Sequence, residues 1–287
     1  MTEVRIHDDT NCLLGEGAFW HPERAQFFWF DILGRKLHTT GRHWEMDRIA
    51  SAAGWIDRDR LLIATETGLT VLNLESGATE DVAEIEADNE VTRSNDGRAD
   101  PMGGFWYGTM GKHAEADAGS IYRYYKGEVR TMWSGLSITN AICFAPDGRT
   151  AYHACTARRV IRTVDLDADG WPAGEPRIFL DLNGEGLNPD GAVTDADGNL
   201  WNAQWGSGRV ACYDPAGTFL RAVDFPARQT SCPAFGGPDY RTLFCTSAAE
   251  GLGEADLADD PRAGQTFAVD LPADLGIAGR PEPRVIL

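Results

Sequence analysis

The chain alternates short runs of apolar and aromatic residues with turns rich in Pro, Asp and Gly. In six segments an apolar strand leads through such a turn into a second strand of aromatic and β-branched residues. These segments cover residues 19–32, 54–73, 97–111, 143–156, 192–205 and 234–247. Their turns fall roughly 36 to 50 residues apart, which is typical of the blades of a β-propeller.

Further strands are predicted between these hairpins, at residues 36–40, 68–74, 120–125, 160–166, 208–214 and 266–271. Two hairpins in each repeat give the four strands of a blade, so the pattern predicts an all-β protein, a six-bladed β-propeller over residues 1–287 as a single domain. We expect the two terminal segments to complete one blade together, because closing the ring removes exposed sheet edges. Residues 251–264 are expected to form a short helical turn on a loop.

Composition and charge narrow the classes of function. The net charge of −18 repels phosphate backbones, so nucleic-acid binding is not expected. No apolar run approaches the roughly 18 residues that span a bilayer, and the N-terminus has no signal-peptide pattern, so we expect a cytoplasmic protein without membrane association. The six cysteines include no CxxC pair and lie mostly among apolar strand residues, which predicts reduced thiols in the core.

Three short polar segments each run directly into a strand–turn–strand unit: Leu14 to Gly17, Ile138 to Ala141 and Asn188 to Gly191. In a propeller the innermost strand of each blade lines the central channel, and its first residues face one mouth. Glu16, Asn140 and Asp190 are therefore predicted to converge. Two carboxylates and an amide suit a hard divalent cation such as Ca²⁺, Mg²⁺ or Mn²⁺, with positions left for water and substrate.

A second interpretation of these segments remains open, because Asp-Gly and Asn-Gly pairs are also common turn residues. A fourth segment, Arg93 to Gly97, places an arginine and the amide of Asn95 at the corresponding place in another blade. The arginine offers a planar array of donors for substrate oxygens, and the amide can donate and accept beside a metal. An ordinary turn with a surface arginine is the alternative.

Six segments in order resemble the SMP-30/gluconolactonase/regucalcin-like family: LGEG, RSNDG, GTMG, ITNAICFAPDGRTAYH, NPDGAVTDADGNLWNAQWGSGRV and SCPAFGGPDYRTLFCTS. The resemblance runs from about Leu13 to Ser247, nearly the whole chain. It implies a six-bladed propeller that hydrolyses sugar lactones with a divalent metal. It also implies Glu16, Asn140 and Asp190 as metal ligands and Arg93 with Asn95 as substrate-binding residues.

The chain departs from the family pattern at two places. Thr139-Asn140-Ala141 stands where the family often has Ser-Asn-Gly, a change that keeps the ligand. A substrate-contacting acid that follows the GTM motif in some members aligns near His113, with Glu115 two residues further on. Both His113 and Glu115 are candidates for contact with the substrate, and we take His113 first; the alternative is that neither contacts it.

The resemblance predicts metal-dependent hydrolysis of a sugar lactone to the aldonic acid, with Asp190 both a ligand and the general base. One divalent ion is expected, Ca²⁺ first, with Mg²⁺, Mn²⁺, Fe²⁺ or Zn²⁺ as alternatives, in a monomer or weak homo-oligomer. The first rival function is a paraoxonase-like esterase or organophosphate hydrolase, which predicts a more apolar pocket. The second is a non-catalytic calcium-binding propeller, which predicts a protein partner and no lactone turnover.

The strand pattern also predicts where four further residues lie, in the core or at the mouth of the channel. His153 lies on a predicted strand, where a structural role is expected rather than a place in the channel. Trp201 is expected in the core, whereas Gln204 or Trp205 could reach the mouth.

Overall fold

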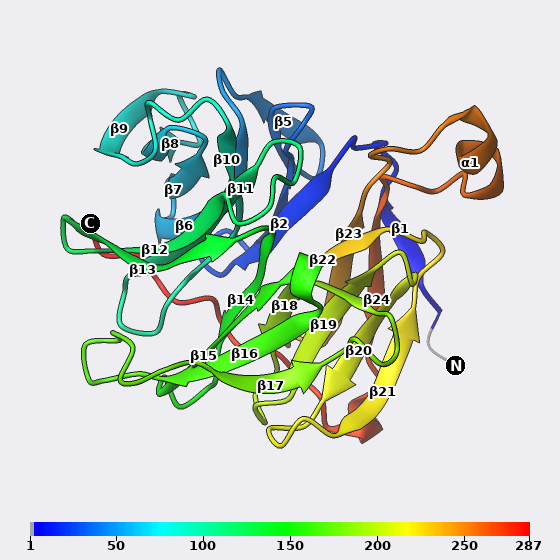
Figure 1. Ribbon diagram of the computed structural model, residues 1–287. Helices are drawn as coiled ribbons and strands as arrows, with labels where there is room; N and C mark the ends of the chain where they lie inside the picture. Colours follow the sequence, from blue (N-terminus) through cyan, green and yellow to red (C-terminus); the bar gives the residue numbers. More distant parts are fainter. Residues whose placement is uncertain (1–2) are drawn as a thin grey trace.

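The computed structural model describes residues 3–287 and consists of six four-stranded antiparallel sheets arranged in a ring (Figure 1). The innermost strands of neighbouring sheets lie against one another around the centre of the ring. The predicted all-β, six-bladed propeller is therefore confirmed. Strands nearest the axis, such as β14 (Thr139–Phe144) and β11 (Phe105–Gly111), are buried on both faces because each sheet packs between two neighbours. Outer strands such as β9 (Thr79–Glu84) and β21 (Phe219–Asp224) are mostly exposed. The Pro, Asp and Gly turns reverse the chain between strands.

The first three blades follow the chain order. Blade 1 contains β2 (Gly15–His21), β3 (Gln26–Asp31), β4 (Lys36–Thr39) and β5 (Arg42–Glu45). Blade 2 contains β6 (Ala50–Asp57), β7 (Arg60–Thr65), β8 (Gly68–Asn73) and β9 (Thr79–Glu84). Blade 3 contains β10 (Thr92–Ala99), β11 (Phe105–Gly111), β12 (Gly119–Tyr125) and β13 (Glu128–Leu136).

The remaining blades complete the ring. Blade 4 contains β14 (Thr139–Phe144), β15 (Thr150–Cys155), β16 (Val160–Asp165) and β17 (Arg177–Asp181). Blade 5 contains β18 (Asn188–Thr194), β19 (Leu200–Trp205), β20 (Arg209–Tyr213) and β21 (Phe219–Asp224). Blade 6 contains β22 (Thr230–Gly236), β23 (Thr242–Ser247), β24 (Thr266–Asp270) and, as its outer strand, β1 (Arg5–Asp8).

The sixth blade joins two distant parts of the chain. Strand β1 pairs antiparallel with β24, with Arg5 opposite Ala268. The Arg5 guanidinium also bonds the Asp270 carboxylate at 2.8 Å on the surface. This pairing confirms the expectation that segments near the two ends of the sequence share one blade, and it covers the edge that β24 would otherwise expose.

The core consists of apolar layers between neighbouring blades. Phe28 of blade 1 packs in one cluster with Leu61 of blade 2, and Trp201 of blade 5 meets Phe235 of blade 6 edge-on, with ring centroids 5.6 Å apart. Trp201 is fully buried, as predicted. All six cysteines are buried with free thiols, which also agrees with the expectation from sequence.

Residues 276–287, here called the C-terminal segment, cross the ends of several blades instead of adding a strand (red in Figure 1). Backbone hydrogen bonds of 2.8 Å join this segment to Tyr240, Ala196, Gly103 and Trp55, which belong to four different blades. Its Glu282 carboxylate forms an ion pair with Arg98 of β10 inside the channel. The C-terminal segment therefore closes the mouth at which the inner strands end.

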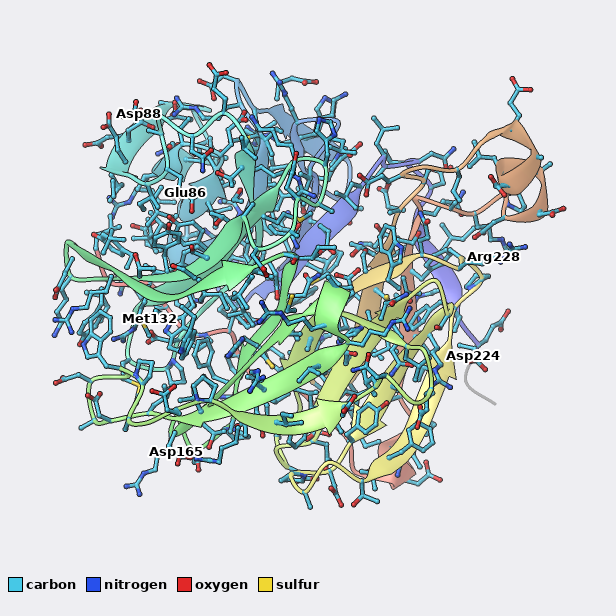
Figure 2. The ribbon with its side chains drawn as sticks, viewed as in Figure 1. Glu86, Asp88, Met132, Asp165, Asp224 and Arg228 are labelled. Carbon is cyan, nitrogen blue, oxygen red and sulfur yellow. The ribbon has the colours of Figure 1, made fainter. Side chains whose placement is uncertain are left out.

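Helical structure is short. The predicted turn within 251–264 is the helix α1 (Glu254–Asp259), and two 3₁₀ turns, η1 (Thr156–Arg158) and η2 (Ala273–Leu275), lie between strands. No helix within residues 3–287 has the length and apolar character needed to cross a membrane. The labelled Asp88, Asp165 and Asp224 in Figure 2 lie at the periphery of the molecule, away from the centre of the ring.

Candidate active site

The inner strands begin at the mouth opposite the C-terminal segment, and the predicted site residues lie at these beginnings. Glu16 is the second residue of β2, Asn140 the second of β14 and Asp190 the third of β18, while Arg93 and Asn95 are on β10. In all four strands the pairing register shifts just at or after these residues. Such bulges turn side chains out of the regular alternation of a strand, here into the channel.

A cavity of about 710 Å³ opens at this mouth. All six residues predicted for the site line it: Glu16, Arg93, Asn95, His113, Asn140 and Asp190. The convergence predicted from the repeated segments is therefore present in the fold. The cavity also has wall residues from loops between outer strands, among them Thr156, Arg159 and Glu250.

Two buried carboxyl groups form the floor of the cavity. Glu16 and Asp190 are each 4% exposed, and their side chains are within hydrogen-bonding reach of each other. Burial, together with the charge of Asp96, raises the pKa of Glu16 to about 8. Burial and the adjacent charge of Glu16 raise the pKa of Asp190 well above its ordinary value. A divalent cation between the two carboxyl groups would relieve this repulsion.

Hydrogen bonds fix the orientation of the two amides. Asn95 donates from Nδ2 to Oδ1 of Asn140 at 3.1 Å and to the Thr139 carbonyl at 2.9 Å. Asn140 in turn donates from Nδ2 to the Thr156 hydroxyl at 2.8 Å, and Thr156 donates to the Pro189 carbonyl at 2.6 Å. With its nitrogen committed to Thr156, Asn140 turns its oxygen away from that residue, and a carbonyl oxygen has a second lone pair.

The donor set therefore fits a hard divalent cation. Glu16 and Asp190 supply carboxylate oxygens, Asn140 supplies an amide oxygen, and no thiol or imidazole is placed with them in the cavity floor within residues 3–287. Oxygen-only sets of this kind suit Ca²⁺ and Mg²⁺ better than zinc.

Below the floor lies a third carboxylate, Asp96. Its oxygens accept hydrogen bonds from the Gly97 amide at 2.8 Å and the Ile142 amide at 2.7 Å. Burial raises the pKa of Asp96, while the nearby Arg98 opposes that shift. Asp96 lies between the floor of the cavity and the Arg98–Glu282 ion pair at the other mouth. Its contacts with Ile142 and Arg98 were not predicted from the sequence.

Arg93 has unused hydrogen-bonding capacity. Its Nη1 donates to the Ser94 carbonyl at 2.9 Å and to Oδ1 of Asn95 at 2.7 Å, which hold the guanidinium in place. Its Nε is buried and has no partner among residues 3–287. Burial lowers the pKa of Arg93, and the acidic charges of Glu250, Glu16 and Asp190 oppose the shift. Nη2 also has no hydrogen-bond partner among residues 3–287, and because Arg93 lines the cavity, Nη2 is the donor available to a ligand oxygen.

His113 and Glu115 have different places on the loop after β11. His113 is exposed and lines the cavity at its mouth. The Glu115 carboxylate accepts a hydrogen bond from the His113 backbone amide at 3.0 Å, and it does not line the cavity. Hydrogen bonds from its own backbone amide and from that of His113 lower the pKa of Glu115. The acid therefore shapes the loop, and the imidazole is the group that faces the opening.

The structure also shows where the three remaining residues with a predicted position lie. Trp205 lines the cavity, whereas Gln204 is buried and donates to the Tyr213 hydroxyl at 2.9 Å. His153 is buried and stacks on Trp133 with ring centroids 4.6 Å apart, so the structural role is confirmed. Burial lowers the pKa of His153 to about 4.

Thr156, Arg159 and Glu250 are among the residues of the cavity wall that sequence reasoning missed. Thr156 begins the turn η1, Arg159 directly follows that turn, and Glu250 lies on the loop after β23. These residues belong to connections between strands, where the strand pattern carries no information about the direction of a side chain. Only Thr156 had a signal in the sequence, because it is the last residue of the predicted hairpin segment 143–156.

Comparison with known proteins agrees with this geometry. Residues 14–249 match the family model described as the SMP-30/Gluconolactonase/LRE-like region. The chain is 38% identical to an L-arabinolactonase of Azospirillum brasilense, over 90% of this chain and 89% of that protein. It is 34% identical to the pentonolactonase XacC of Haloferax volcanii, over 99% and 98%.

A solved structure described as the calcium-binding protein regucalcin, from Agrobacterium tumefaciens, is 40% identical and superimposes with a TM-score of 0.95, covering 100% of this chain and 98% of that one. The relatives match along almost the full chain, so the resemblance includes the blades that carry the cavity floor. The protein belongs to the SMP-30/gluconolactonase/LRE-like family, whose named relatives include sugar lactonases.

Proposed function

We propose that this protein hydrolyses a sugar lactone to the corresponding aldonic acid. The observation that carries the proposal is the buried Glu16–Asp190 carboxyl pair at the floor of a cavity that also presents Arg93 and Asn95. The names of the arabinolactonase and pentonolactonase relatives support the same reaction class.

Glu16, Asn140 and Asp190 would hold one divalent cation, with Ca²⁺ the first candidate. When bound, such an ion supplies electrophilic polarisation of the lactone carbonyl oxygen and lowers the cost of the charge that develops there. The calcium-binding description of the Agrobacterium relative supports this choice.

Asp190 would act as the general base. Its carboxylate accepts a proton as a water oxygen bonds to the lactone carbonyl carbon. The bond between that carbon and the ring oxygen then breaks, and the ring oxygen receives the proton to become a hydroxyl. The products are one aldonate and one proton for each lactone, so acid release measures turnover directly.

Arg93, Asn95 and His113 would position the substrate. The Nη2 group of Arg93, which has no partner among residues 3–287, can donate to a sugar oxygen, while the Nη1 contacts keep the guanidinium rigid. Asn95 is held by Thr139 and Asn140, so its amide is already oriented before substrate arrives. His113 stands at the mouth, where it can contact the part of the sugar far from the floor.

The test is a pH-indicator assay on a panel of aldonolactones, with spontaneous hydrolysis subtracted. Protein stripped with EDTA receives Ca²⁺, Mg²⁺, Mn²⁺, Fe²⁺ or Zn²⁺ singly, and we expect one or more ions to restore turnover of a sugar lactone. Aryl esters and an organophosphate triester are assayed in parallel. Activity on those compounds but not on lactones would favour the esterase function, and no activity in folded, ion-loaded protein would favour a binding propeller.

A further inference from the structure

Arg159 stands on the wall of the cavity in an unusual backbone conformation. It follows the turn η1 and has a φ of 52°, in the left-handed region that glycine adopts more readily than arginine. Its amide donates to the Thr156 carbonyl and its carbonyl accepts from Leu182, each at 2.9 Å. The main chain is thus held on both sides, and the half-buried side chain lies in the cavity.

The Arg159 guanidinium is oriented but not neutralised. Its Nε donates to Oδ1 of Asn188 at 3.0 Å, and Asn188 donates from Nδ2 to the Trp205 carbonyl at 3.3 Å. Within residues 3–287 its two Nη groups have no hydrogen-bond partner, and it forms no ion pair. One edge of the guanidinium is therefore fixed, while the donors of Nη1 and Nη2 remain for a ligand.

Neighbouring Arg158 shows what a structural arginine on this turn does. Its Nη2 donates to the Asp117 carboxylate at 2.8 Å and to the Gly135 carbonyl at 2.6 Å, and it is outside the cavity lining. Lys112, the lysine of the cavity wall, is also committed, because its Nζ lies 2.7 Å from the Glu66 carboxylate. Arg159 differs from both in having no acidic partner.

The position of Arg159 relative to the floor suits an elongated ligand. Its partner Asn188 precedes Asp190 by two residues on β18, about 7 Å along an extended strand. A lactone whose carbonyl lies at Asp190 can therefore extend its exocyclic end toward Arg159. In a protein of net charge −18, an unpaired guanidinium is needed to make this end of the cavity favourable for an anion.

We propose that Arg159 recognises a terminal anion, a carboxylate or a phosphate, on the far end of the substrate lactone. This inference rests on the proposed lactonase function and narrows its substrate class to acidic sugar lactones. Arg159 is then a specificity-determining residue, and Asn188 is the positioning residue that aims its free edge.

The experiment compares matched neutral and anionic lactones on the cation-loaded enzyme. D-glucono-1,5-lactone is paired with its 6-phosphate, and D-glucono-1,4-lactone with D-glucaro-1,4-lactone. We expect kcat/KM to be higher for the anionic member of at least one pair. A preference in the first pair identifies phosphate as the anion that Arg159 binds, and a preference in the second identifies carboxylate. Arg159→Gln is expected to lower that preference about 10- to 100-fold, mainly through KM, because it removes charge-assisted hydrogen bonds.

Arg158→Gln is the matched control and should leave the preference unchanged, since Arg158 bonds Asp117 outside the cavity. Arg159→Lys should restore part of the preference because it keeps the charge. Lactone turnover without preference for either anion, or an equal preference in Arg159→Gln, overturns the inference while the lactonase function stands.

Calorimetric titration makes the result independent of turnover. The probes are D-gluconate, D-glucarate and 6-phospho-D-gluconate, added to the cation-loaded protein and to Arg159→Gln. Tighter binding of D-glucarate or 6-phospho-D-gluconate than of D-gluconate, lost in the variant, supports the inference even if no lactone is hydrolysed. Equal binding by both proteins overturns it, whatever the activity.

Discussion

Asn140 donates a 2.8 Å hydrogen bond from its side-chain nitrogen to the hydroxyl of Thr156, a residue from the opposite end of the β14–β15 hairpin. The same hydroxyl donates to the Pro189 carbonyl of the next blade, adjacent to Asp190. One side chain thus ties together two of the three proposed cation ligands. Groups that orient metal ligands in this way often control affinity as strongly as the ligands themselves.

Thr156→Val removes the hydroxyl while keeping the shape of the side chain. We expect cation affinity or kcat/KM to fall about 10- to 100-fold, because the Asn140 amide loses the partner that fixes its orientation. Calcium titration by calorimetry and the lactone assay measure the two quantities. Thr156→Ser retains the hydroxyl and should stay near the parent protein; an equal loss in both variants would contradict the proposed positioning role.

Asp190→Asn tests the general base. At saturating cation, kcat is expected to fall by about two to four orders of magnitude, the usual contribution of a positioned proton acceptor. Asp195→Asn is a buried control in the same blade, where the carboxylate accepts from Trp201 Nε1 at 3.0 Å. That change should lower Tm and leave kcat at a permissive temperature intact. Unchanged turnover of Asp190→Asn with its cation bound would remove the base assignment.

The raised pKa of Glu16 predicts a pH-dependent stability of the cation-free protein. Between about 4.5 and about 8 the folded protein retains a proton on Glu16 that the unfolded chain has lost. The free energy of unfolding therefore falls as pH rises through this range, by at most about 1.4 kcal/mol per pH unit for one group. Bound cation replaces the proton, so its stabilising effect should grow with pH.

Chemical denaturation at pH 5 to 8, with EDTA or with saturating Ca²⁺, measures this dependence. Glu16→Gln removes one titrating proton and should make the pH profile of the chelated protein shallower, with Asp190 and Asp96, whose pKa values are also raised, contributing the remainder. If the unfolding free energy has the same slope against pH in the parent and in Glu16→Gln, Glu16 ionises at its ordinary pKa and the prediction is wrong.

The Arg98–Glu282 pair predicts the largest effect on stability. Both side chains are nearly excluded from solvent, at 8% and 11% exposure, so Glu282→Gln leaves a buried guanidinium without its counter-ion. We expect a loss of about 3 kcal/mol or more in unfolding free energy. Glu128→Gln breaks the exposed pair with Arg130 and should cost less than about 1 kcal/mol. Thermal unfolding of the two variants compares them, and equal costs would show that burial adds nothing.

The blades were predictable because their strands depend on local patterns: apolar strands, Pro/Asp/Gly turns and a regular repeat. The convergence of Glu16, Asn140 and Asp190 followed from equivalent positions in repeated units, and Trp201 in the core followed from its strand. The bulges at these positions were not predictable, because they arise where inner strands crowd around the axis. Arg159 and Thr156 were missed because their directions depend on how η1 packs against the neighbouring blade.

The C-terminal segment was likewise outside the reach of the strand pattern. Its residues make backbone hydrogen bonds to blade ends far away in sequence, and no local periodicity encodes such contacts. The charge on Glu282 would ordinarily suggest a solvent-exposed residue, and only the fold brings it to Arg98.

The ion pair between Arg98 and Glu282 joins residues 184 positions apart in the chain. At ribosomal rates of about 5 to 20 residues per second, roughly 10 to 40 s separate the synthesis of the two. During that interval the third blade can form, but its buried arginine has no counter-ion and the channel is open at both ends. Because Glu282 follows the last blade strand, β24, the C-terminal segment can close this mouth only after all six blades have been synthesised.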